Sequence, residues 1–282
     1  MNGRDDSPTA SPTDAKTGDA GMTAPPRALV IGGAKRVGRA ICLELARQGC
    51  EVVFTYNTSA VESESLVREL RAIGGGRNGT DAKVFACHRL NLAEASERWA
   101  ELDAVVSSGP CWDVLVLSAS VYEPCALNEL SRDRLVRDYA VNAIAPAMIA
   151  RAVAPHLSKS TMPGGGSIVM MGDVHAMGPS GRPRTGFLSY SMSKSALTEL
   201  ALSLSRALAP NVRVNVVAPG VVAFPESGPE SDRAEQQRYL SRVPMARAGT
   251  PEEAAKAVAW LALAATYTTG QVLRVDGGRG VV

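Results

Sequence analysis

From residue 27 onward, short apolar runs alternate along the chain with segments of helical length. The runs at 28–31 and 114–117 are continuously apolar and do not alternate with polar residues. Continuous apolar runs are typical of strands that helices cover on both faces of a parallel sheet. The pattern therefore predicts an α/β fold, a doubly wound seven-stranded parallel sheet with helices on both faces.

The order of these segments predicts where each element lies. Strands are expected at 28–31, 51–56, 82–87, 114–117, 168–171, 212–217 and 271–275. Helices are expected at 37–48, 59–73, 92–106, 131–157, 188–209 and 251–264. Because we find no internal repeat and no second core, residues 27–282 are expected to form a single domain.

Residues 1–26 contain no Leu, Ile, Val or aromatic side chain. Such a segment cannot bury enough apolar surface to offset its chain entropy, so we expect a disordered N-terminal tail. An apolar core of the kind found in signal peptides is missing from it, and Met22 is a candidate start of translation.

Charge and cysteine usage narrow the class of protein. Lys and Arg number 30 against 28 Asp and Glu, a net charge of +2, so we expect no nucleic-acid partner and no anionic membrane surface as partner. No apolar stretch is long enough to span a bilayer. Five cysteines without a CxxC pair predict reduced thiols in a cytoplasmic protein, and three widely spaced histidines predict no metal site.

Ligands of an open parallel sheet bind beyond the carboxyl ends of its strands. The first strand is followed by a glycine-containing turn with Gly32, Lys35, Arg36, Val37 and Gly38. This turn predicts close approach of a pyrophosphate to a helix N-terminus. The alternative is an ordinary strand-to-helix turn.

The second strand runs into Tyr56, Asn57, Thr58 and Ser59 and ends without an acid. An NAD site places an Asp or Glu there for the ribose 2′-hydroxyl, whereas hydroxyls and an amide suit a 2′-phosphate. With Lys35 and Arg36 nearby, the sequence favours NADP(H) over NAD(H). The alternative is that the phosphate contact is simply absent.

Tyr190 and Lys194 open the helix expected at 188–209. Their i, i+4 spacing places the phenol and the ammonium on one face, one turn apart. An adjacent cation favours the phenolate of a tyrosine, so the pair suits acid–base work beside a hydride-transfer cofactor.

Over about residues 27–282 the chain resembles the short-chain dehydrogenase/reductase family, which has a Rossmann fold. The matching residues are the glycine turn, Asn91-Leu92, Asn142, Tyr190, Lys194, Pro219-Gly220, Thr269-Gly270 and the run at 275–278. The resemblance implies a homotetramer packed through long helices. It also implies further cofactor contacts at Asn91, Leu92, Ala119, Ser120, Asn142, Pro219, Gly220 and Val221.

Three departures look like the pteridine reductase branch, which reduces pterins and folates with NADPH. Asp173 stands where most members carry the catalytic Ser, Arg36 replaces the middle glycine of the turn, and the run at 141–146 matches that branch. This resemblance implies a catalytic set of Asp173, Tyr190 and Lys194. It implies a substrate site of Arg36, Ser120, Tyr122, Asp173 and Tyr190, with the ring of Tyr122 stacked on the pterin.

Two features leave other functions open. Residues 117–120 read Leu-Ser-Ala-Ser, whereas the family has Asn-Asn-Ala followed by Gly or Ser, so the amide that supports the cofactor is lost. An insertion also lies between Asp173 and Tyr190. The alternatives are a carbonyl reductase for a ketone, such as a 3-oxoacyl thioester or a small quinone, and a non-catalytic NADP(H)-binding protein. The stretch 224–239 resembles the family's mobile substrate lid. His175 is interpreted as a loop residue or a proton relay, and Arg182 and Arg184 as loop residues or contacts for an anionic substrate tail.

Overall fold

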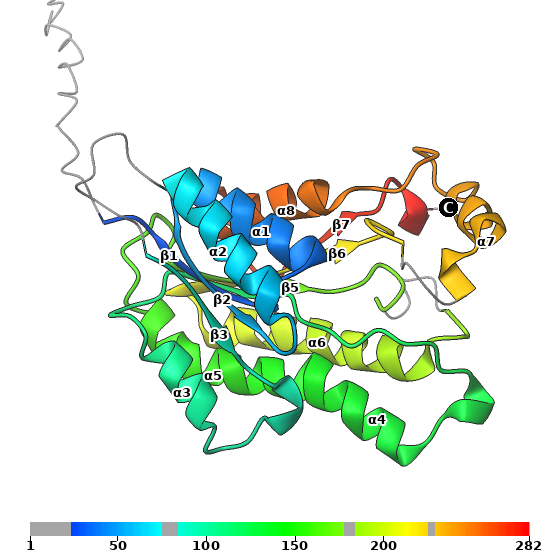
Figure 1. Cartoon of the computed structure of the whole chain (residues 1–282), viewed down its shortest axis with the longest axis horizontal. Helices are drawn as coiled ribbons and strands as arrows, with labels where there is room; N and C mark the ends of the chain where they lie inside the picture. Colours follow the sequence, from blue (N-terminus) through cyan, green and yellow to red (C-terminus); the bar gives the residue numbers. More distant parts are fainter. Residues whose placement is uncertain (1–23, 75–83, 178–183, 225–228, 282) are drawn as a thin grey trace, which may run out of the picture.

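Seven parallel strands form one central sheet in the order β3-β2-β1-β4-β5-β6-β7. The computed structural model of the chain describes residues 24–74, 84–177, 184–224 and 229–281 (Figure 1). The strands are β1 (Arg27–Ile31), β2 (Glu51–Tyr56), β3 (Phe85–Arg89), β4 (Val114–Leu117), β5 (Gly166–Met171), β6 (Val212–Pro219) and β7 (Val272–Val275). The order reverses between β1 and β4, so the segments that follow these strands diverge and open a cleft at their carboxyl ends.

Helices cover both faces of the sheet, as the sequence predicts (Figure 1). One layer consists of α1 (Arg36–Arg47), α2 (Ala60–Gly74) and α8 (Pro251–Ala259). The other consists of α3 (Ala100–Val106), α4 (Arg132–Tyr139), α5 (Ala145–Leu157) and α6 (Leu188–Ala207), and α7 (Arg233–Leu240) lies at one end of the molecule.

Successive side chains of a strand point to opposite faces of the sheet, and helices cover both faces, which explains why the strand sequences are apolar throughout. Val30 belongs to the core under α1 and α8, whereas its neighbours Leu29 and Ile31 belong to the core under α5 and α6. Each of these residues is at most 1% exposed, so both faces of the strand are buried against helices. The predicted single sheet between two helical layers is therefore confirmed.

Two expected elements differ from the structure. β3 begins at Phe85, whereas a strand was expected from residue 82, and residues 82 and 83 lie outside the described ranges. The helix expected at 92–106 is a 3-10 turn at Leu92–Glu94 followed by α3. Side chains compete with the helical hydrogen bonds here, because Asn91 accepts from the Ala93 amide and Ser96 donates to the Arg98 carbonyl.

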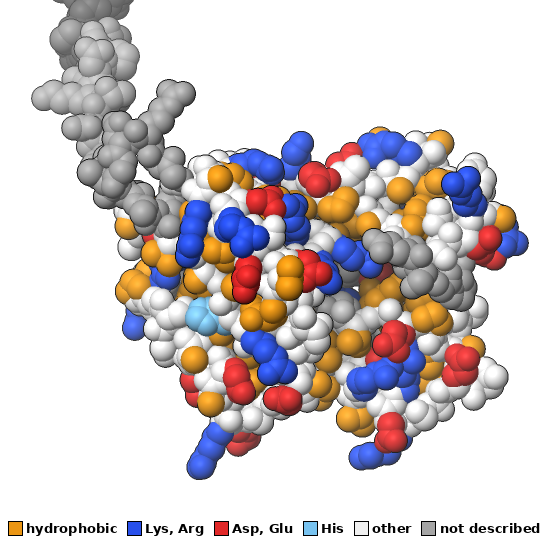
Figure 2. Space-filling view, viewed as in Figure 1, with side chains coloured by type: hydrophobic (Ala, Val, Ile, Leu, Met, Phe, Trp, Pro, Cys, Tyr) orange, Lys and Arg blue, Asp and Glu red, His pale blue; other side chains and the backbone are white. Residues whose placement is uncertain are grey.

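Other expectations for the chain are met or fall outside the described part. The helices expected at 131–157 and 251–264 each form, and each includes a π-helical turn, at Ala140–Ile144 and at Trp260–Ala264. Residues 1–23 of the tail and 178–183 of the insertion lie outside the described ranges. Within those ranges every helix is too short or too polar to cross a membrane. Basic and acidic side chains are interspersed on the face in Figure 2.

Candidate active site

The turn after β1 is pressed against the segment that follows β4. Gly32 has φ +80°, and a Cβ atom there would lie 2.6 Å from the Cβ of Ala119. The Gly32 amide donates to the buried Thr55 hydroxyl of β2 at 3.1 Å, a contact that sequence reasoning missed. Only glycine fits this conformation and this spacing, so the turn brings the backbone to the sheet edge without a side chain in the way.

Arg36, in the same turn, also has an unusual backbone conformation. Its φ of 51° is in the left-handed region, which costs a residue with a side chain about 1–2 kcal/mol. Its Nη2 donates to the carbonyl of Ala223 at 2.8 Å, on the segment after β6. The guanidinium therefore bridges the two sides of the cleft.

A cavity of about 420 Å³ extends along the carboxyl ends of the strands. Among the residues expected to bind the cofactor it is lined by Gly32, Lys35, Arg36, Val37, Gly38, Tyr56, Asn57, Thr58, Ser59, Ala119, Ser120, Tyr190, Lys194 and Pro219. Ser118 of the run at 117–120 lines it as well, and so do Thr55 and Met171, which the sequence analysis did not single out. The structure therefore brings the first two strand ends and the start of α6 to one space.

The charge beside the end of β2 differs from the sequence interpretation in one respect. No acid follows β2 directly, but Glu62 of α2 accepts an ion pair from Lys35, with 2.6 Å between Nζ and Oε1. The hydrogen bond from Lys35 lowers the pKa of Glu62. Both side chains are about half exposed, so water screens the ion pair and the pair holds Lys35 only weakly.

Three residues expected at the cofactor do not line the cavities described. Asn91 caps the 3-10 turn and Leu92 is buried in the core. Asn142, fully buried in the π-helical turn, accepts from the Val121 amide and the Ser120 hydroxyl at 2.9 and 3.0 Å. Its amide therefore fixes the loop after β4, which carries Ser where the family carries Asn. Gly220 and Val221 line a smaller neighbouring cavity.

Asp173, Tyr190 and Lys194 converge between β5 and α6. The Tyr190 hydroxyl donates to Asp173 Oδ2 at 2.9 Å, and the His175 amide donates to Asp173 Oδ1 at 2.7 Å. Lys194 is 2% exposed and donates to the carbonyl of Met171 at 2.8 Å. Tyr190 and Lys194 are thus buried and Asp173 is partly buried, with Tyr190 hydrogen-bonded to Asp173 and Lys194 to the end of β5.

Burial is the main cause of the pKa shifts of Tyr190 and Lys194. Burial, followed by the Asp173 carboxylate, raises the pKa of Tyr190 well above its usual 10. Burial lowers the pKa of Lys194 to about 8, against which Asp173 acts only in part. The expectation that Lys194 favours the Tyr190 phenolate finds no support in these shifts, because burial and the Asp173 carboxylate both favour the neutral phenol. The phenol of Tyr190 is therefore protonated at neutral pH and donates its hydrogen bond to Asp173.

Both the ring and the hydroxyl of Tyr122 contact neighbouring side chains. Its ring stacks on Phe187 with 4.7 Å between centroids and 14° between planes, and it meets Tyr190 edge-on at 4.8 Å. Its hydroxyl donates to Glu230 and accepts from Arg184, both at 2.6 Å. Burial raises the pKa of Tyr122 to about 12, so it stays protonated. Phe187 and Glu230 are contacts that sequence reasoning missed.

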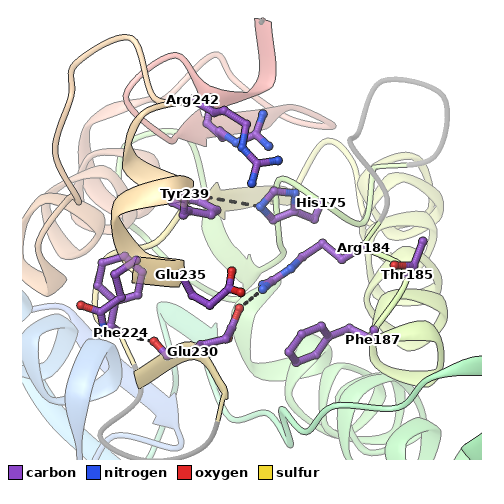
Figure 3. Close-up of a pocket in the computed structure, with 12 residues that line it drawn as sticks. His175, Arg184, Thr185, Phe187, Phe224, Glu230, Glu235, Tyr239 and Arg242 are labelled. Atoms are coloured by element: carbon purple, nitrogen blue, oxygen red, sulfur yellow. Dashed lines mark hydrogen bonds and ion pairs between the residues drawn. The ribbon is translucent and has the colours of Figure 1, made fainter. Parts of the chain in front are cut away.

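A larger cavity of about 530 Å³ continues from this point under α7 (Figure 3). Arg184 forms an ion pair with Glu230 across it, and the His175 ring nitrogen Nε2 lies 3.3 Å from the Tyr239 hydroxyl. The stretch expected as a lid therefore supplies one wall through Glu230 and α7, while residues 225–228 lie outside the described ranges. His175, expected as a loop residue or a proton relay, lies in the turn after β5 and is buried.

Comparison with known proteins places this geometry in a family. A family model described as Enoyl-(Acyl carrier protein) reductase matches residues 32–279. The 3-oxoacyl-[acyl-carrier-protein] reductase FabG of Staphylococcus aureus is 31% identical over 253 residues, covering 89% of this chain and 96% of that protein.

Solved structures agree with that match. A short-chain dehydrogenase/reductase from Serratia marcescens superposes with a TM-score of 0.77 at 31% identity, covering 90% of this chain and 98% of that one. A short-chain dehydrogenase from Burkholderia cenocepacia, solved with NADP, has a TM-score of 0.76 at 27% identity, covering 90% and 97%. NADP in that neighbour agrees with the NADP(H) expectation. The chain belongs to the short-chain dehydrogenase/reductase family of oxidoreductases.

Proposed function

We propose that this protein is an NADPH-dependent reductase that delivers hydride to a polarised C=N bond of a pterin or dihydropterin. The observation that carries the proposal is the hydrogen bond from the Tyr190 hydroxyl to the Asp173 carboxylate, in a buried site beside the cavity at the strand ends. Substrate identity rests on the chemistry of that carboxylate.

The cavity at the strand ends fits a dinucleotide. A Cβ atom at Gly38 would lie 2.0 Å from the Gly32 carbonyl oxygen, so glycine there lets the first turn of α1 pack closely on the loop after β1. The N-terminus of α1 thereby lines the cavity, where its backbone amides could bind a pyrophosphate. Asn57, Thr58 and Ser59 line the cavity where a ribose 2′-phosphate would lie, without an acid from β2 to repel it. NADPH, when bound, supplies the hydride. The Lys194 ammonium, buried beside the cavity, would hold the nicotinamide ribose.

The proton that the reaction consumes comes from the hydroxyl of Tyr190 in this proposal. After hydride reaches an electrophilic pterin carbon, the adjacent ring nitrogen must gain a proton. Tyr190, kept neutral by burial and by Asp173, donates that proton from its hydroxyl. Asp173 accepts a hydrogen bond from the same hydroxyl, so it orients the phenol. The proton that Tyr190 gives to the substrate is replaced from solvent, by way of Asp173 after that carboxylate has itself taken up a proton.

A carboxylate at this position favours a substrate that presents N–H donors. An ionised carboxylate only accepts hydrogen bonds, and so it repels the oxyanion that develops when a ketone is reduced. Pterin ring nitrogens and its amino group offer donors that Asp173 can fix. Tyr122 borders both the strand-end cavity and the smaller cavity beside Asp173, where a substrate ring would meet the nicotinamide. Arg36 and Ser120 would contact the polar edge of that ring.

The test is NADPH oxidation with dihydrobiopterin, dihydrofolate and a panel of ketones, measured for the wild type and for Asp173→Ser. We expect turnover with a dihydropterin, and a strong loss of it in Asp173→Ser while NADPH binding is retained. Intact dihydropterin turnover in Asp173→Ser, or a wild type that reduces only ketones, would contradict the pterin assignment.

A second candidate is a carbonyl reductase acting on a 3-oxoacyl thioester. The similarity to 3-oxoacyl-[acyl-carrier-protein] reductase favours it. Asp173→Ser should then maintain or increase ketone turnover, because Ser donates a hydrogen bond to the carbonyl oxygen. A non-catalytic NADP(H)-binding role is disfavoured by the assembled Tyr190 and Asp173, which binding alone does not require. We further propose a homotetramer and a cytoplasmic location.

A further inference from the structure

We infer that Glu62 of α2 is a determinant of cofactor specificity, because its carboxylate competes with the 2′-phosphate of NADP(H) for the ammonium of Lys35. This competition takes place at the cofactor, so it does not depend on whether the substrate is a pterin or a ketone. An acid does not follow β2 directly, and Glu62, the third residue of the next helix, was not singled out from the sequence.

The ion pair between Lys35 and Glu62 lies at the border of the cavity at the strand ends. Lys35 lines that cavity, whereas Glu62 is not among the lining residues. The Lys35 Nζ lies 2.6 Å from Glu62 Oε1, so the carboxylate binds the ammonium directly. Lys35 directly precedes α1 and Glu62 lies in the first turn of α2, and these two helices belong to the same layer over the sheet (Figure 1). The pair therefore joins the turn after β1 to the helix after β2.

The same ammonium is placed to bind a 2′-phosphate. The lining of the cavity includes the basic residues Lys35, Arg36 and Lys194. Lys194 donates to the end of β5, and Arg36 donates to the segment after β6. Glu62 follows the lining residues 57–59 by one helical turn, so its contact with Lys35 holds the ammonium beside that segment. Lys35 is about half exposed and its side chain is flexible, so it can turn from the carboxylate to a phosphate bound there.

The two nicotinamide cofactors affect this ion pair differently. NAD(H) has a hydroxyl at the ribose 2′ position, so Lys35 keeps its bond to Glu62. NADP(H) has a phosphate there, with a charge of about −1.5 to −2. When Lys35 binds this phosphate, Glu62 loses its partner and faces a group of like charge. The hydrogen bond from Lys35 lowers the pKa of Glu62, so the carboxylate is ionised at neutral pH. Glu62 therefore weakens the binding of NADP(H) and reduces the preference over NAD(H).

Calorimetric titration of the cofactor-free protein tests this competition without turnover. The ligands are NADP⁺, NAD⁺, adenosine 2′,5′-bisphosphate and 5′-AMP. We expect Glu62→Gln, which keeps the size of the side chain, to tighten the two ligands with a 2′-phosphate about two- to fivefold, the range of an exposed ion pair. The affinities for NAD⁺ and 5′-AMP should not change. In about 1 M salt the gain should disappear, because the screening length falls to about 3 Å.

Glu69→Gln is the matched control. Glu69 lies two turns further along the same helix and forms an ion pair with Arg39 of α1 at 2.5 Å. Both side chains are partly exposed, as Lys35 and Glu62 are, but neither Glu69 nor Arg39 lines the cavity at the strand ends. This variant should leave the affinities for all four ligands unchanged.

A double-mutant comparison separates competition for Lys35 from a general effect of charge. Lys35→Met should weaken the binding of NADP⁺, and in this background Glu62→Gln should give a smaller gain than in the wild type. An equal gain in both backgrounds would overturn the competition.

Three other results would also overturn it. In one, Glu62→Gln weakens NADP⁺ binding, which would mean that the carboxylate orients Lys35 for the phosphate. In the second, NAD⁺ and NADP⁺ change equally. In the third, Glu62→Gln leaves the affinity for NADP⁺ as it is in the wild type. Because none of these titrations requires turnover, a protein that reduces neither pterins nor ketones would contradict the proposed function and leave the result on Glu62 intact.

Discussion

Lys194 places a charge in the core at a cost that can be measured. Burial lowers its pKa from 10.5 to about 8. At about 1.4 kcal/mol per pH unit, the ammonium is about 3 kcal/mol less favourable in the fold than in water. Lys194→Met removes that cost but also takes a donor from the Met171 carbonyl, a loss of about 1 kcal/mol. We expect the cofactor-free variant to be about 2 kcal/mol more stable at neutral pH, a rise of about 4–8 °C in melting temperature.

The sign of this effect sets its pH dependence. Below pH 8 the lysine is charged in both states, so the folded wild type bears the full cost. Between pH 8 and 10.5 the folded lysine is neutral while the unfolded one still binds a proton, and the wild type gains stability as the pH rises. The advantage of Lys194→Met should therefore be complete below pH 8 and disappear by about pH 10.5.

Urea unfolding of cofactor-free wild type and Lys194→Met from pH 7 to pH 10.5 measures this difference directly. The exposed Lys159→Met serves as control and should change stability by less than about 0.5 kcal/mol at every pH. A variant that is no more stable than the wild type at pH 7, or an advantage that does not shrink at alkaline pH, would refute the reasoning. NADPH oxidation should be lost in the same variant, because the proposed contact with the nicotinamide ribose is removed.

Four further predictions concern the site, the cofactor, the tail and the assembly. Tyr190→Phe keeps the ring but removes the proton donor, so turnover should fall about 10²–10⁴-fold while NADPH fluorescence titration shows unchanged binding. NADPH should bind about tenfold to a hundredfold more tightly than NADH, the scale of a charge-assisted phosphate contact, and equal affinities would contradict this. Deletion of residues 1–21 should leave folding and turnover unchanged, and a drop of several degrees in melting temperature would mean that the tail docks. Light scattering at micromolar concentration should give a tetramer, whereas a monomer would rule it out.

The local pattern determined much of the fold. Apolar runs that must face helices on both sides identified the strands, and β4 and β2 begin and end where the pattern places them. Positions that follow strands identified most of the cavity lining, because the carboxyl ends of parallel strands share one edge. The pattern was less accurate at β3 and at 92–106, where side chains of Asn91 and Ser96 bond to the backbone and interrupt the regular element.

Only the tertiary structure decided how the site is charged. Spacing along the helix placed a cation near Tyr190 and favoured the phenolate, but folding buried both groups and set Asp173, 17 residues away, against the hydroxyl. Likewise, Tyr122 meets Glu230 across 108 residues of sequence, and Arg184 is neutralised by the same carboxylate. A pKa and a charge balance depend on every group within a few ångströms and on the water that burial excludes. The spacing of residues along the sequence determines neither the pKa nor the charge balance, because both depend on segments that meet only when the chain has folded.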